Sequence, residues 1–347
     1  MKTYKKAKDI RVGVVGYGGA YNMGKAHLTQ MNAAGMTPAA VADTDESRLA
    51  VAKEEFPGIA TFNSVGRMLG NSDVDLVVLI TPHNTHAKLA LKCLKAGRHV
   101  VCEKPLAITT AECDRMIREA GKRNRMLSTY HNRHWDGCVV EALKQIRDRG
   151  RIGEIVRIDA HMTGYGQPRD WWRSSKSISG GILYDWGVHF LEYALQLVDS
   201  SIVEVSGFAH TGFWAPKVAW KDDTNEDEAS AIIRFTSGAW MTLTMSQIDA
   251  ASRCPDRKWF EITGTKGTYF FDGKGWKIVL PKKNKTVVEE GSNPPNAWQN
   301  YYNNIAAYLT GKEELVISAD WSRRPIHILD LAGRSAKQGK ALKAKHR

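Results

Sequence analysis

The sequence lacks long apolar runs and has few cysteines. None of its 347 residues fall in a run approaching the roughly 20 apolar residues of a membrane-spanning helix, so we expect no membrane partner. The basic N-terminus leads into a glycine-broken strand and not into the apolar core of a signal peptide. The cysteines are odd in number and show no CxxC or CxH spacing: Cys93, Cys102, Cys113, Cys138 and Cys254. This pattern is typical of reduced thiols in a cytoplasmic protein and indicates no metal site.

Acidic residues are missing from both ends of the chain, and this explains most of the net charge of +12. Residues 1–8 carry four lysines, and residues 336–347 carry four lysines and one arginine. The charge left for the body of the protein is small. We therefore expect no nucleic-acid partner.

A glycine-rich turn follows the first predicted strand, Ile10–Val15. Gly16, Gly18 and Gly19 come directly after it, and a helix opens near Asn22. Glycine lets the backbone approach a pyrophosphate closely, and a helix N-terminus offers free N–H groups, so this stretch predicts a dinucleotide cradle. The alternative is an ordinary glycine turn. The coenzyme contacts that we expect here are Gly16, Gly18, Gly19, Tyr21, Asn22 and Met23.

The glycine pattern is irregular. The position of the third glycine in a GxGxxG motif holds Tyr21, and the next glycine is Gly24. We therefore expect a lengthened turn.

Strands and helices alternate through residues 9–130. The expected strands after the first are Thr37–Ala42, Asp75–Ile80, His99–Cys102 and Met126–Tyr130, and the expected helices are Met23–Ala34, Leu49–Phe56, Thr85–Ala96 and Thr110–Arg123. This alternation predicts an α/β fold, a doubly wound parallel sheet of the dinucleotide-binding kind.

Asp43 ends the second predicted strand. A carboxylate at this place can accept hydrogen bonds from the adenosine ribose hydroxyls, which favours NAD over NADP. The alternative is a helix N-cap, because Asp43, Asp45 and Ser47 all precede a helix.

Residues 131–347 have a different character. Segments with period two, separated by short turns, predict an α+β domain with an open, mainly antiparallel sheet. The expected strands are Glu154–His161, Ile202–His210, Ala229–Phe235, Trp240–Gln247, Trp259–Thr263, Thr268–Phe271 and Trp276–Leu280. The expected helices are Gly137–Arg149, Ile182–Val198, Ala297–Leu309 and Ser322–Lys343.

Two short motifs carry groups suited to proton transfer. Glu103-Lys104-Pro105 follows a strand of the parallel sheet, at the edge where ligands bind in such folds. Asp185-x-Gly187-x-His189 opens a predicted helix, where a spacing of four places the carboxylate and the imidazole on one face. Each residue also has an alternative interpretation without function. Lys104 could be a surface lysine, Asp185 a helix cap and His189 a packed core histidine.

The ordered set of motifs resembles the glucose–fructose oxidoreductase/inositol dehydrogenase family (Gfo/Idh/MocA) over nearly the whole chain. The set comprises the glycine turn, Thr81-Pro82 with His86, Glu103-Lys104-Pro105 and Asp185-x-Gly187-x-His189. The resemblance implies a Rossmann domain followed by an α+β domain whose open sheet forms oligomer contacts, in a dimer or tetramer. It also implies oxidation or reduction of a secondary alcohol or ketone on a sugar or cyclitol. The coenzyme contacts that it adds are Thr81, Pro82, His86, Glu103 and Lys104.

Carried over position by position, the family's catalytic groups fall on Lys104, Asp185 and His189. We expect His189 to be the base, Lys104 to stabilise the substrate oxygen, and Asp185 to position substrate or histidine. The sequence departs from the family pattern at Tyr21, at His83 where asparagine is frequent, and at Glu192 where aspartate is frequent.

An aromatic stretch supplies the expected substrate pocket. Large aromatic faces can stack on the apolar side of a sugar ring, although one of Trp171 and Trp172 is expected to serve packing. Arg173 could bind a carboxylate or phosphate, or lie in a solvated loop. The expected substrate contacts are Tyr165, Trp172, Arg173, Trp186, Asn132 and His134.

Three functions fit this reading. The first is an NAD-dependent dehydrogenase of a sugar, glycoside or cyclitol. The second is an NAD-retaining glycosidase of the same family, which works by oxidation, elimination and reduction. The third is a non-catalytic sugar sensor, against which the presence of both Lys104 and His189 argues.

Overall fold

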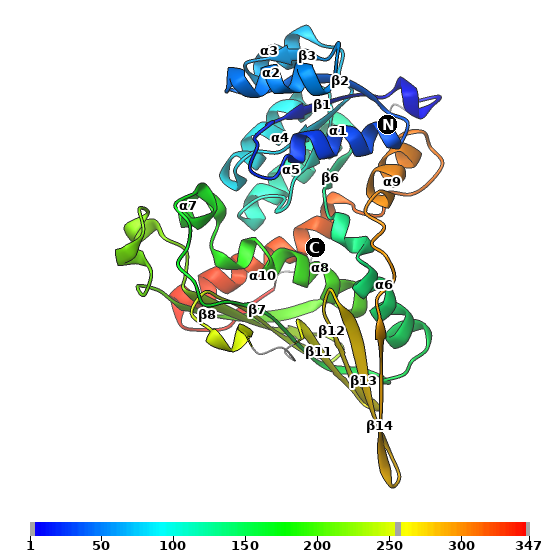
Figure 1. Ribbon diagram of the computed structural model, residues 1–347, viewed down its shortest axis with the longest axis vertical. Coiled ribbons are helices and arrows are strands. Elements are labelled where there is room, and N and C mark those ends of the chain that lie inside the picture. The colour runs from blue at the N-terminus through cyan, green and yellow to red at the C-terminus, as the bar shows by residue number, and fades with distance from the viewer. Residues whose placement is uncertain (1–3, 254–257, 345–347) are drawn as a thin grey trace. The chain divides into compact units, whose positions relative to one another are not determined.

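The chain divides into two compact units in a computed structural model that describes residues 4–253 and 258–344 (Figure 1). Unit 1 comprises Met1–Asn132 and Gln299–Arg324, and unit 2 comprises Arg133–Trp298 and Pro325–Arg347. Residues 299–324, which the sequence pattern placed in the second half, therefore group with the first.

Unit 1 is built on a six-stranded parallel sheet in the order β3-β2-β1-β4-β5-β6. Its strands are β1 (Arg11–Val15), β2 (Thr37–Ala42), β3 (Ala60–Phe62), β4 (Leu76–Leu79), β5 (His99–Cys102) and β6 (Leu127–Thr129). The order reverses between β1 and β4, which makes this the switch point where doubly wound sheets bind ligands. The predicted α/β fold is confirmed.

Helices α2, α3 and α5 of unit 1 begin at side chains that cap them. Asp45, Ser64 and Thr109 each accept a hydrogen bond from a backbone N–H in the first turn of the helix that follows. The helices are α1 (Met23–Ala33), α2 (Glu46–Glu55), α3 (Val65–Asn71), α4 (His86–Lys95), α5 (Thr110–Arg123), α9 (Asn300–Leu309) and the start of α10 (Ala319–Gln338). Neither β3 nor α3 was predicted, because each is too short to show a period.

Unit 2 contains a nine-stranded mixed sheet in the order β14-β13-β12-β11-β7-β10-β9-β8-β15. Its strands are β7 (Ile155–Thr163), β8 (Ile202–His210), β9 (Glu228–Phe235), β10 (Trp240–Ser246), β11 (Phe260–Gly264), β12 (Gly267–Phe271), β13 (Gly275–Lys282), β14 (Lys285–Ser292) and β15 (Leu342–Lys343). Of the paired strands, β7 and β10 are parallel and the others antiparallel. The mainly antiparallel sheet is confirmed, with β14 and β15 added.

Helices cover one face of this sheet. All eleven residues of α8 (Gly187–Leu197) are buried. The other helices of unit 2 are α6 (Gly137–Leu143), extended by a π-turn over Lys144–Asp148, α7 (Lys176–Ser179) and the remainder of α10.

The predicted helix Ile182–Val198 is wrong in its first part. A 3₁₀ turn spans Ile182–Tyr184, and α8 begins only at Gly187. The Ile182 N–H donates to the Glu226 carboxylate at 3.0 Å, and Gly181 lies at φ 120°. A tertiary hydrogen bond and a glycine-only backbone therefore interrupt the helix.

Four of the five cysteines lie in the described residues, and all four are free and buried: Cys93, Cys102, Cys113 and Cys138. Burial raises the pKa of the Cys93 and Cys138 thiols to about 12, so they are poor nucleophiles at neutral pH. The prediction for Cys254 falls outside the described residues. Within residues 4–253 and 258–344, no helix is both long and apolar enough to span a bilayer, and no cluster of metal-binding side chains occurs.

Candidate functional site

The candidate site residues fall on both units. The glycine turn, the Thr81 and Glu103 turns and Asn132 belong to unit 1. Tyr165, Asp185, His189 and their neighbours belong to unit 2. Lys104 and His189 therefore come from separate units, and each group is described within its own unit.

The glycine turn of unit 1 spans Gly16–Asn22, between β1 and α1. Gly16 has φ 96°, and a Cβ atom there would lie 2.2 Å from the Ile80 carbonyl oxygen. A Cβ at Gly18 would meet no atom within 4 Å. The first position therefore excludes every side chain, whereas the second leaves space above the backbone.

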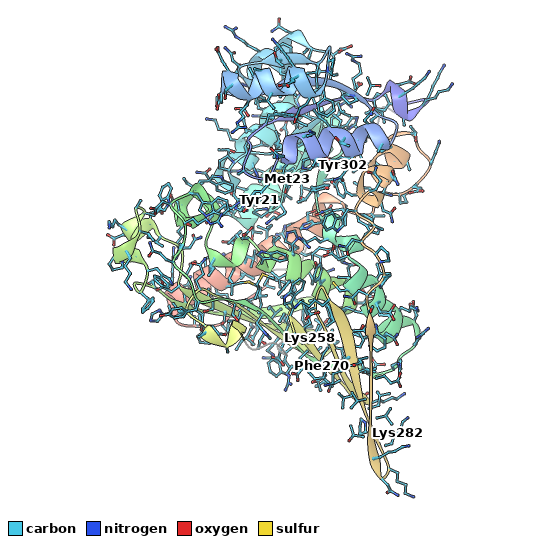
Figure 2. All side chains as sticks on the ribbon, in the orientation of Figure 1. Tyr21, Met23, Lys258, Phe270, Lys282 and Tyr302 are labelled. Atoms are coloured by element: carbon cyan, nitrogen blue, oxygen red, sulfur yellow. The ribbon has the colours of Figure 1, made fainter. Side chains whose placement is uncertain are left out.

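The turn extends through Asn22, as the shifted glycines predict, and Gly24 has a packing role in the first turn of α1. A Cβ at Gly24 would lie 2.5 Å from Cδ2 of Tyr17 and 3.1 Å from the Gly16 carbonyl oxygen. Helix α1 starts at Met23 after Asn22, whose φ is 50° and whose side chain does not cap the helix. Figure 2 labels Tyr21, which is 58% exposed, and Met23 at this helix start.

Asp43 follows β2, and its side chain holds the glycine turn by accepting hydrogen bonds from main-chain N–H groups. Its two carboxylate oxygens accept from the Tyr17 N–H at 2.6 Å and from the Asp45 N–H at 3.0 Å. Asp45, and not Asp43, caps α2. The Arg48 guanidinium covers Gly19, since a Cβ there would lie 2.5 Å from its Nη1 atom.

The turns after β4 and β5 are braced by His86. Its Nε2 atom lies 2.8 Å from the Thr81 carbonyl oxygen, and its Nδ1 atom lies 2.7 Å from the Pro105 carbonyl oxygen. Thr81 and Thr85 share a hydroxyl–hydroxyl hydrogen bond of 2.6 Å. The buried histidine thus ties together the two turns on which coenzyme contacts are expected.

Lys104 follows Glu103 at the carboxyl end of β5. The Lys104 N–H donates to Glu103 Oε2 at 3.0 Å, while His27 Nε2 lies 3.0 Å from Glu103 Oε1. Burial raises the pKa of Glu103, but the hydrogen bond from His27, the charge of Lys104 and the Lys104 N–H outweigh it and leave the pKa below its usual value. The residue beside Lys104 is therefore a carboxylate.

In unit 2, Asp185 lies before α8 and pairs with Arg173. Arg173 Nη1 donates to Asp185 Oδ1 at 2.9 Å. The Arg173 guanidinium also lies over the Trp172 ring, 4.7 Å from its centroid, and 5.6 Å from that of Trp171. Arg173 is therefore fixed by a carboxylate and an indole, and is not a freely solvated loop residue.

His189 lies in the first turn of α8 and is 5% exposed. Its ring packs edge-on to Trp186, with 5.6 Å between centroids. The Arg133 guanidinium lies 4.6 Å from the same indole centroid. Trp186 thus lies beside both an imidazole and a cation.

Glu192 lies one turn further along α8 and holds His134. Glu192 Oε1 lies 2.5 Å from His134 Nδ1, and Oε2 accepts from Gln196 Nε2 at 3.0 Å. The departure from the family pattern at Glu192 thus provides the partner of an expected substrate residue.

Asp136 is a residue of this region that the sequence analysis did not single out. Its carboxylate accepts from Arg133 at 3.0 Å, from the Trp298 indole at 2.5 Å, and from the Tyr193 hydroxyl. The spacing of Arg133 and Asp136 is a signal of a local pair. Nothing local points to Trp298, which lies 162 residues further along the chain.

Tyr165 lies in an aromatic group with Phe213 and Trp214. The ring centroids of Phe213 and Trp214 lie 6.4 Å and 5.9 Å from that of Tyr165. Tyr165 is 46% exposed and Phe213 39% exposed, whereas Trp214 is buried. Two of the three rings are therefore exposed and one is buried.

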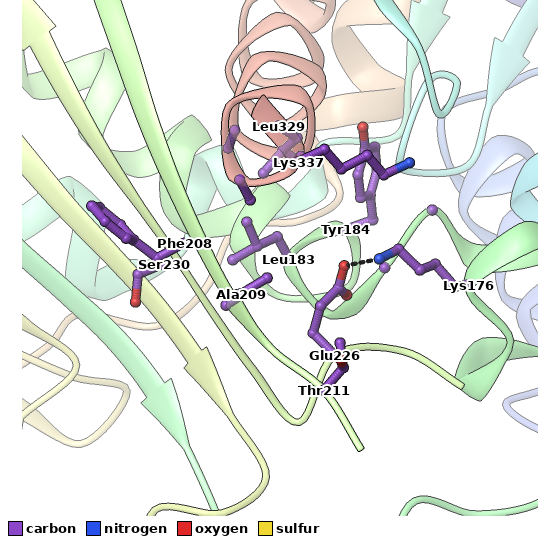
Figure 3. A pocket seen from close by; sticks show the side chains of 16 residues that line it. Lys176, Leu183, Tyr184, Phe208, Ala209, Thr211, Glu226, Ser230, Leu329 and Lys337 are labelled. Atoms are coloured by element: carbon purple, nitrogen blue, oxygen red, sulfur yellow. Dashed lines mark ion pairs between the residues drawn. The ribbon is translucent and has the colours of Figure 1, made fainter. Parts of the chain in front are cut away.

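A cavity of about 220 Å³ lies elsewhere in unit 2 (Figure 3). It is lined by β8 and α10 and by the loop carrying Gly180 and Gly181. Lys176 and Glu226 form an ion pair of 2.7 Å at its wall. Its lining includes neither His189 nor Asp185.

The residues of unit 1 fit a dinucleotide. The side-chain-free approach at Gly16, the open space above Gly18 and the start of α1 without a side-chain cap supply the features that a pyrophosphate needs. The Asp43 carboxylate stands at the tip of the neighbouring strand. A parallel sheet with these features at its switch point defines a dinucleotide-binding protein with a second, mixed-sheet unit.

Comparison with known proteins defines the family. Residues 10–131 match the model "Oxidoreductase family, NAD-binding Rossmann fold", and residues 140–270 match the "GFO/IDH/MocA C-terminal domain". The chain is 31% identical to myo-inositol 2-dehydrogenase of Thermotoga maritima, over 76% of this chain and 75% of the relative. The chain belongs to the Gfo/Idh/MocA family.

Other relatives match over less of their length. The chain is 33% identical to the uncharacterised oxidoreductase YdgJ of Escherichia coli, over 54% of each protein. The chain thus spans about half the length of several curated relatives that it matches, and 40% of two of them. The solved structure of an NAD-binding protein from Listeria innocua has a TM-score of 0.80 and 26% identity, and covers 97% of both chains.

Proposed function

We propose that the protein is an NAD-dependent oxidoreductase that transfers hydride between nicotinamide and a secondary alcohol or ketone of a sugar, glycoside or cyclitol. The observation that carries this proposal lies in unit 1. The glycine turn, the Thr81 turn and Lys104 follow β1, β4 and β5, which are neighbouring strands of one parallel sheet. Lys104 thus lies at the same carboxyl end of the parallel strands as the glycine turn.

The chemistry requires a base, because a secondary alcohol releases hydride readily only as its hydroxyl proton leaves. A bound nicotinamide would accept the hydride. His189 takes the hydroxyl proton at an imidazole nitrogen, and Lys104 stabilises the charge that develops on the same oxygen. Asp185, held by Arg173, orients the substrate.

Two findings support a polyhydroxylated ring as substrate. The relative that matches over three quarters of its length is named a myo-inositol 2-dehydrogenase. The candidate substrate groups of unit 2 combine aromatic faces with hydrogen-bonding side chains, which suit a sugar or cyclitol. Trp172, Arg173, Trp186, His134 and Tyr165 belong to this set, and Asn132 precedes it in the chain.

The proposed coenzyme is NAD. The Asp43 carboxylate at the tip of β2 would face the 2′-phosphate of NADP with like charge, which costs about 1–4 kcal/mol at ~4 Å for ordinary effective dielectric constants. Arg48 is the opposing group, because its guanidinium lies over Gly19 close by.

We also propose a cytoplasmic homo-oligomer, a dimer or tetramer, formed through the sheet of unit 2. Ala231, Ile233 and Met241 of this sheet are fully buried, whereas Ile232 and Trp240, which alternate with them, are half-buried. This second face is the one that a partner copy would cover. Light scattering coupled to size exclusion measures the assembly, and a monomer at micromolar concentration would contradict the proposal.

The test of the function is a coenzyme-reduction screen over inositols, hexoses, uronates and aryl glycosides. We expect stoichiometric NADH release with a cyclitol or sugar. The aromatic group of Tyr165, Phe213 and Trp214 favours a second candidate, the NAD-retaining glycosidase, because it suits a bulky aglycone. Many aglycones released per NAD, without NADH accumulation, would replace the dehydrogenase by the glycosidase.

A further inference from the structure

His27 is a fully buried histidine of α1 that lies between two polar groups of unit 1. Its Nε2 atom lies 3.0 Å from Glu103 Oε1, and its Nδ1 atom lies 2.5 Å from the Tyr302 hydroxyl. Tyr302, which is labelled in Figure 2, belongs to α9. Three elements far apart in sequence therefore meet at one imidazole.

The direction of these hydrogen bonds follows from the chemistry of the partners. Glu103 is ionised, so its oxygens only accept, and His27 must carry a proton on Nε2. Burial raises the pKa of the Tyr302 hydroxyl well above its usual value, so this group keeps its proton and can donate to Nδ1. The chain of bonds runs from the Tyr302 O–H through the imidazole to the Glu103 carboxylate.

The chain of bonds continues to Lys104. The second oxygen of Glu103 accepts the Lys104 N–H at 3.0 Å. Both carboxylate oxygens of Glu103 are thus held, one by a side chain of α1 and one by the backbone of the lysine itself. A rotation of the carboxylate would break both bonds.

Aromatic packing prevents the imidazole from turning. The His27 ring lies edge-on to Tyr130, with centroids 4.3 Å apart, and edge-on to Tyr302 at 5.8 Å. The Tyr130 hydroxyl in turn donates to Gln30 of the same helix at 2.7 Å. The surroundings fix the orientation of the ring as well as its position.

We propose that His27 and Tyr302 are positioning residues for Lys104, acting through Glu103. They fix the turn from which the lysine projects, so that its ammonium is held where the substrate oxygen is stabilised. Both side chains are fully buried. The proposal rests on the proposed function of Lys104, and it assigns to α9 a part in the reaction.

The experiment compares four variants with the wild-type protein. His27→Leu removes both ring nitrogens at similar volume, whereas His27→Gln returns an amide N–H to Glu103. Tyr302→Phe removes one hydroxyl, and Lys104→Met removes the ammonium. The measurements are kcat and KM on the best substrate of the screen, NADH affinity by fluorescence titration, thermal unfolding, and the acetylation rate of Lys104 by peptide mass spectrometry.

We expect His27→Leu to lower kcat ~10-fold or more, with KM and NADH affinity within about 2-fold of wild type. His27→Gln recovers most of the loss. In the Lys104→Met background, His27→Leu has little further effect, because the residue acts through the lysine. The acetylation rate of Lys104 changes at least ~3-fold in His27→Leu and is near wild type in His27→Gln.

A purely structural role gives a different result. A lower melting temperature with unchanged kcat and unchanged Lys104 acetylation would overturn the proposal, as would an equal loss in the Lys104→Met background. If His27→Leu does not fold, Tyr302→Phe decides. We expect it to lower kcat about 3-fold and to alter the acetylation rate of Lys104. The absence of both changes would overturn the proposal.

Failure of the proposed function is recognised separately. It shows as no coenzyme reduction by any substrate, or as a Lys104→Met variant that turns over like the wild type. The acetylation rate of Lys104 then still reports whether His27 and Tyr302 control its surroundings.

Discussion

The candidate coenzyme residues of unit 1 and the candidate substrate residues of unit 2 are built in different ways. In unit 1 the main chain forms the cradle, and the decisive feature is a missing side chain at Gly16. In unit 2 the site consists of side chains held by other side chains, as in the pair of Arg173 and Asp185. A main-chain site recognises what dinucleotides share, whereas a side-chain site can be changed for each substrate.

This difference predicts where each unit tolerates substitution. The glycine turn of unit 1 should fail when a Cβ is added at Gly16. The candidate substrate residues of unit 2 should lose function when a charge or a ring is removed, with the fold unaffected. The predictions below test this division.

The largest effect is expected from the two proposed catalytic groups, one on each unit. Lys104→Met and His189→Ala should each lower turnover by ~10²-fold or more, because each acts on the substrate oxygen in the transition state. NADH affinity, measured by fluorescence titration, should stay nearly unchanged. Near-wild-type turnover in either variant would remove that residue from the mechanism.

Gly16→Ala should weaken NADH binding ~10-fold or more and lower the free energy of unfolding by about 2–4 kcal/mol. The reasons are the positive φ and the Ile80 carbonyl oxygen 2.2 Å from the added Cβ. Gly18→Ala is the matched control, because its Cβ meets no atom within 4 Å and should leave the free energy of unfolding unchanged. Equal melting temperatures for the two variants would contradict the division.

Asp43→Asn should lower the ratio of the NADP and NAD dissociation constants at least ~5-fold, because a like charge facing the 2′-phosphate is removed. Asp45→Asn serves as control, since asparagine also caps helices and the residue lies only two positions away. Direct titration with both coenzymes measures the ratio. Tighter wild-type binding of NADP than of NAD would show that Arg48 outweighs Asp43.

Arg173→Met should raise KM about 5-fold with a smaller change in kcat, because the partner of Asp185 and the cation over Trp172 are lost together. Arg169→Met, an exposed arginine of the same loop, is the control and should behave like the wild type. Steady-state kinetics on the best substrate decides. An equal rise of KM in both variants would show that the net charge of the loop, and not the specific contacts of Arg173, causes the effect.

The smallest effect concerns pH. Hydrogen bonds from Tyr17 and Lys25 hold the pKa of Glu55 below its usual value. A lowered carboxyl pKa stabilises the fold at neutral pH, and this contribution is lost on acidification as pH falls through the folded-state value. Compared with Glu55→Gln, the wild type should lose about 1–2 °C of melting temperature more between pH 7 and pH 4. If the melting temperatures of the wild type and Glu55→Gln fell in parallel with pH, the hydrogen bonds of Glu55 would contribute nothing to stability.

The sequence predicts unit 1 better than unit 2, and the reason is the range of the interactions. Helix Thr110–Arg123 appears as predicted, because the cap at Thr109 and the apolar period are both local. Strand β14 was missed because most of its residues are exposed and show no period. The helix before Asp185 was misread because Glu226, more than forty residues later, interrupts it.

The candidate site follows the same rule. Motifs locate Lys104 and His189, since each lies in a short recognisable pattern. Their partners cannot be read in this way, because His27 meets Tyr302 across 275 residues of sequence. Arg133 and Asp136 lie three apart, but the Trp298 indole that completes the group comes from the end of the unit's main segment.

The chain passes between the two units three times, after Asn132, after Trp298 and within α10 at Arg324. No single proteolytic cut or truncation therefore releases an intact coenzyme-binding unit. A fragment ending at residue 132 would lose the Tyr301 hydroxyl and the Ile317 carbonyl oxygen that satisfy the buried Ser128 hydroxyl. Producing this unit by itself requires an engineered gene in which a short linker replaces residues 133–298 and joins residue 132 to residue 299.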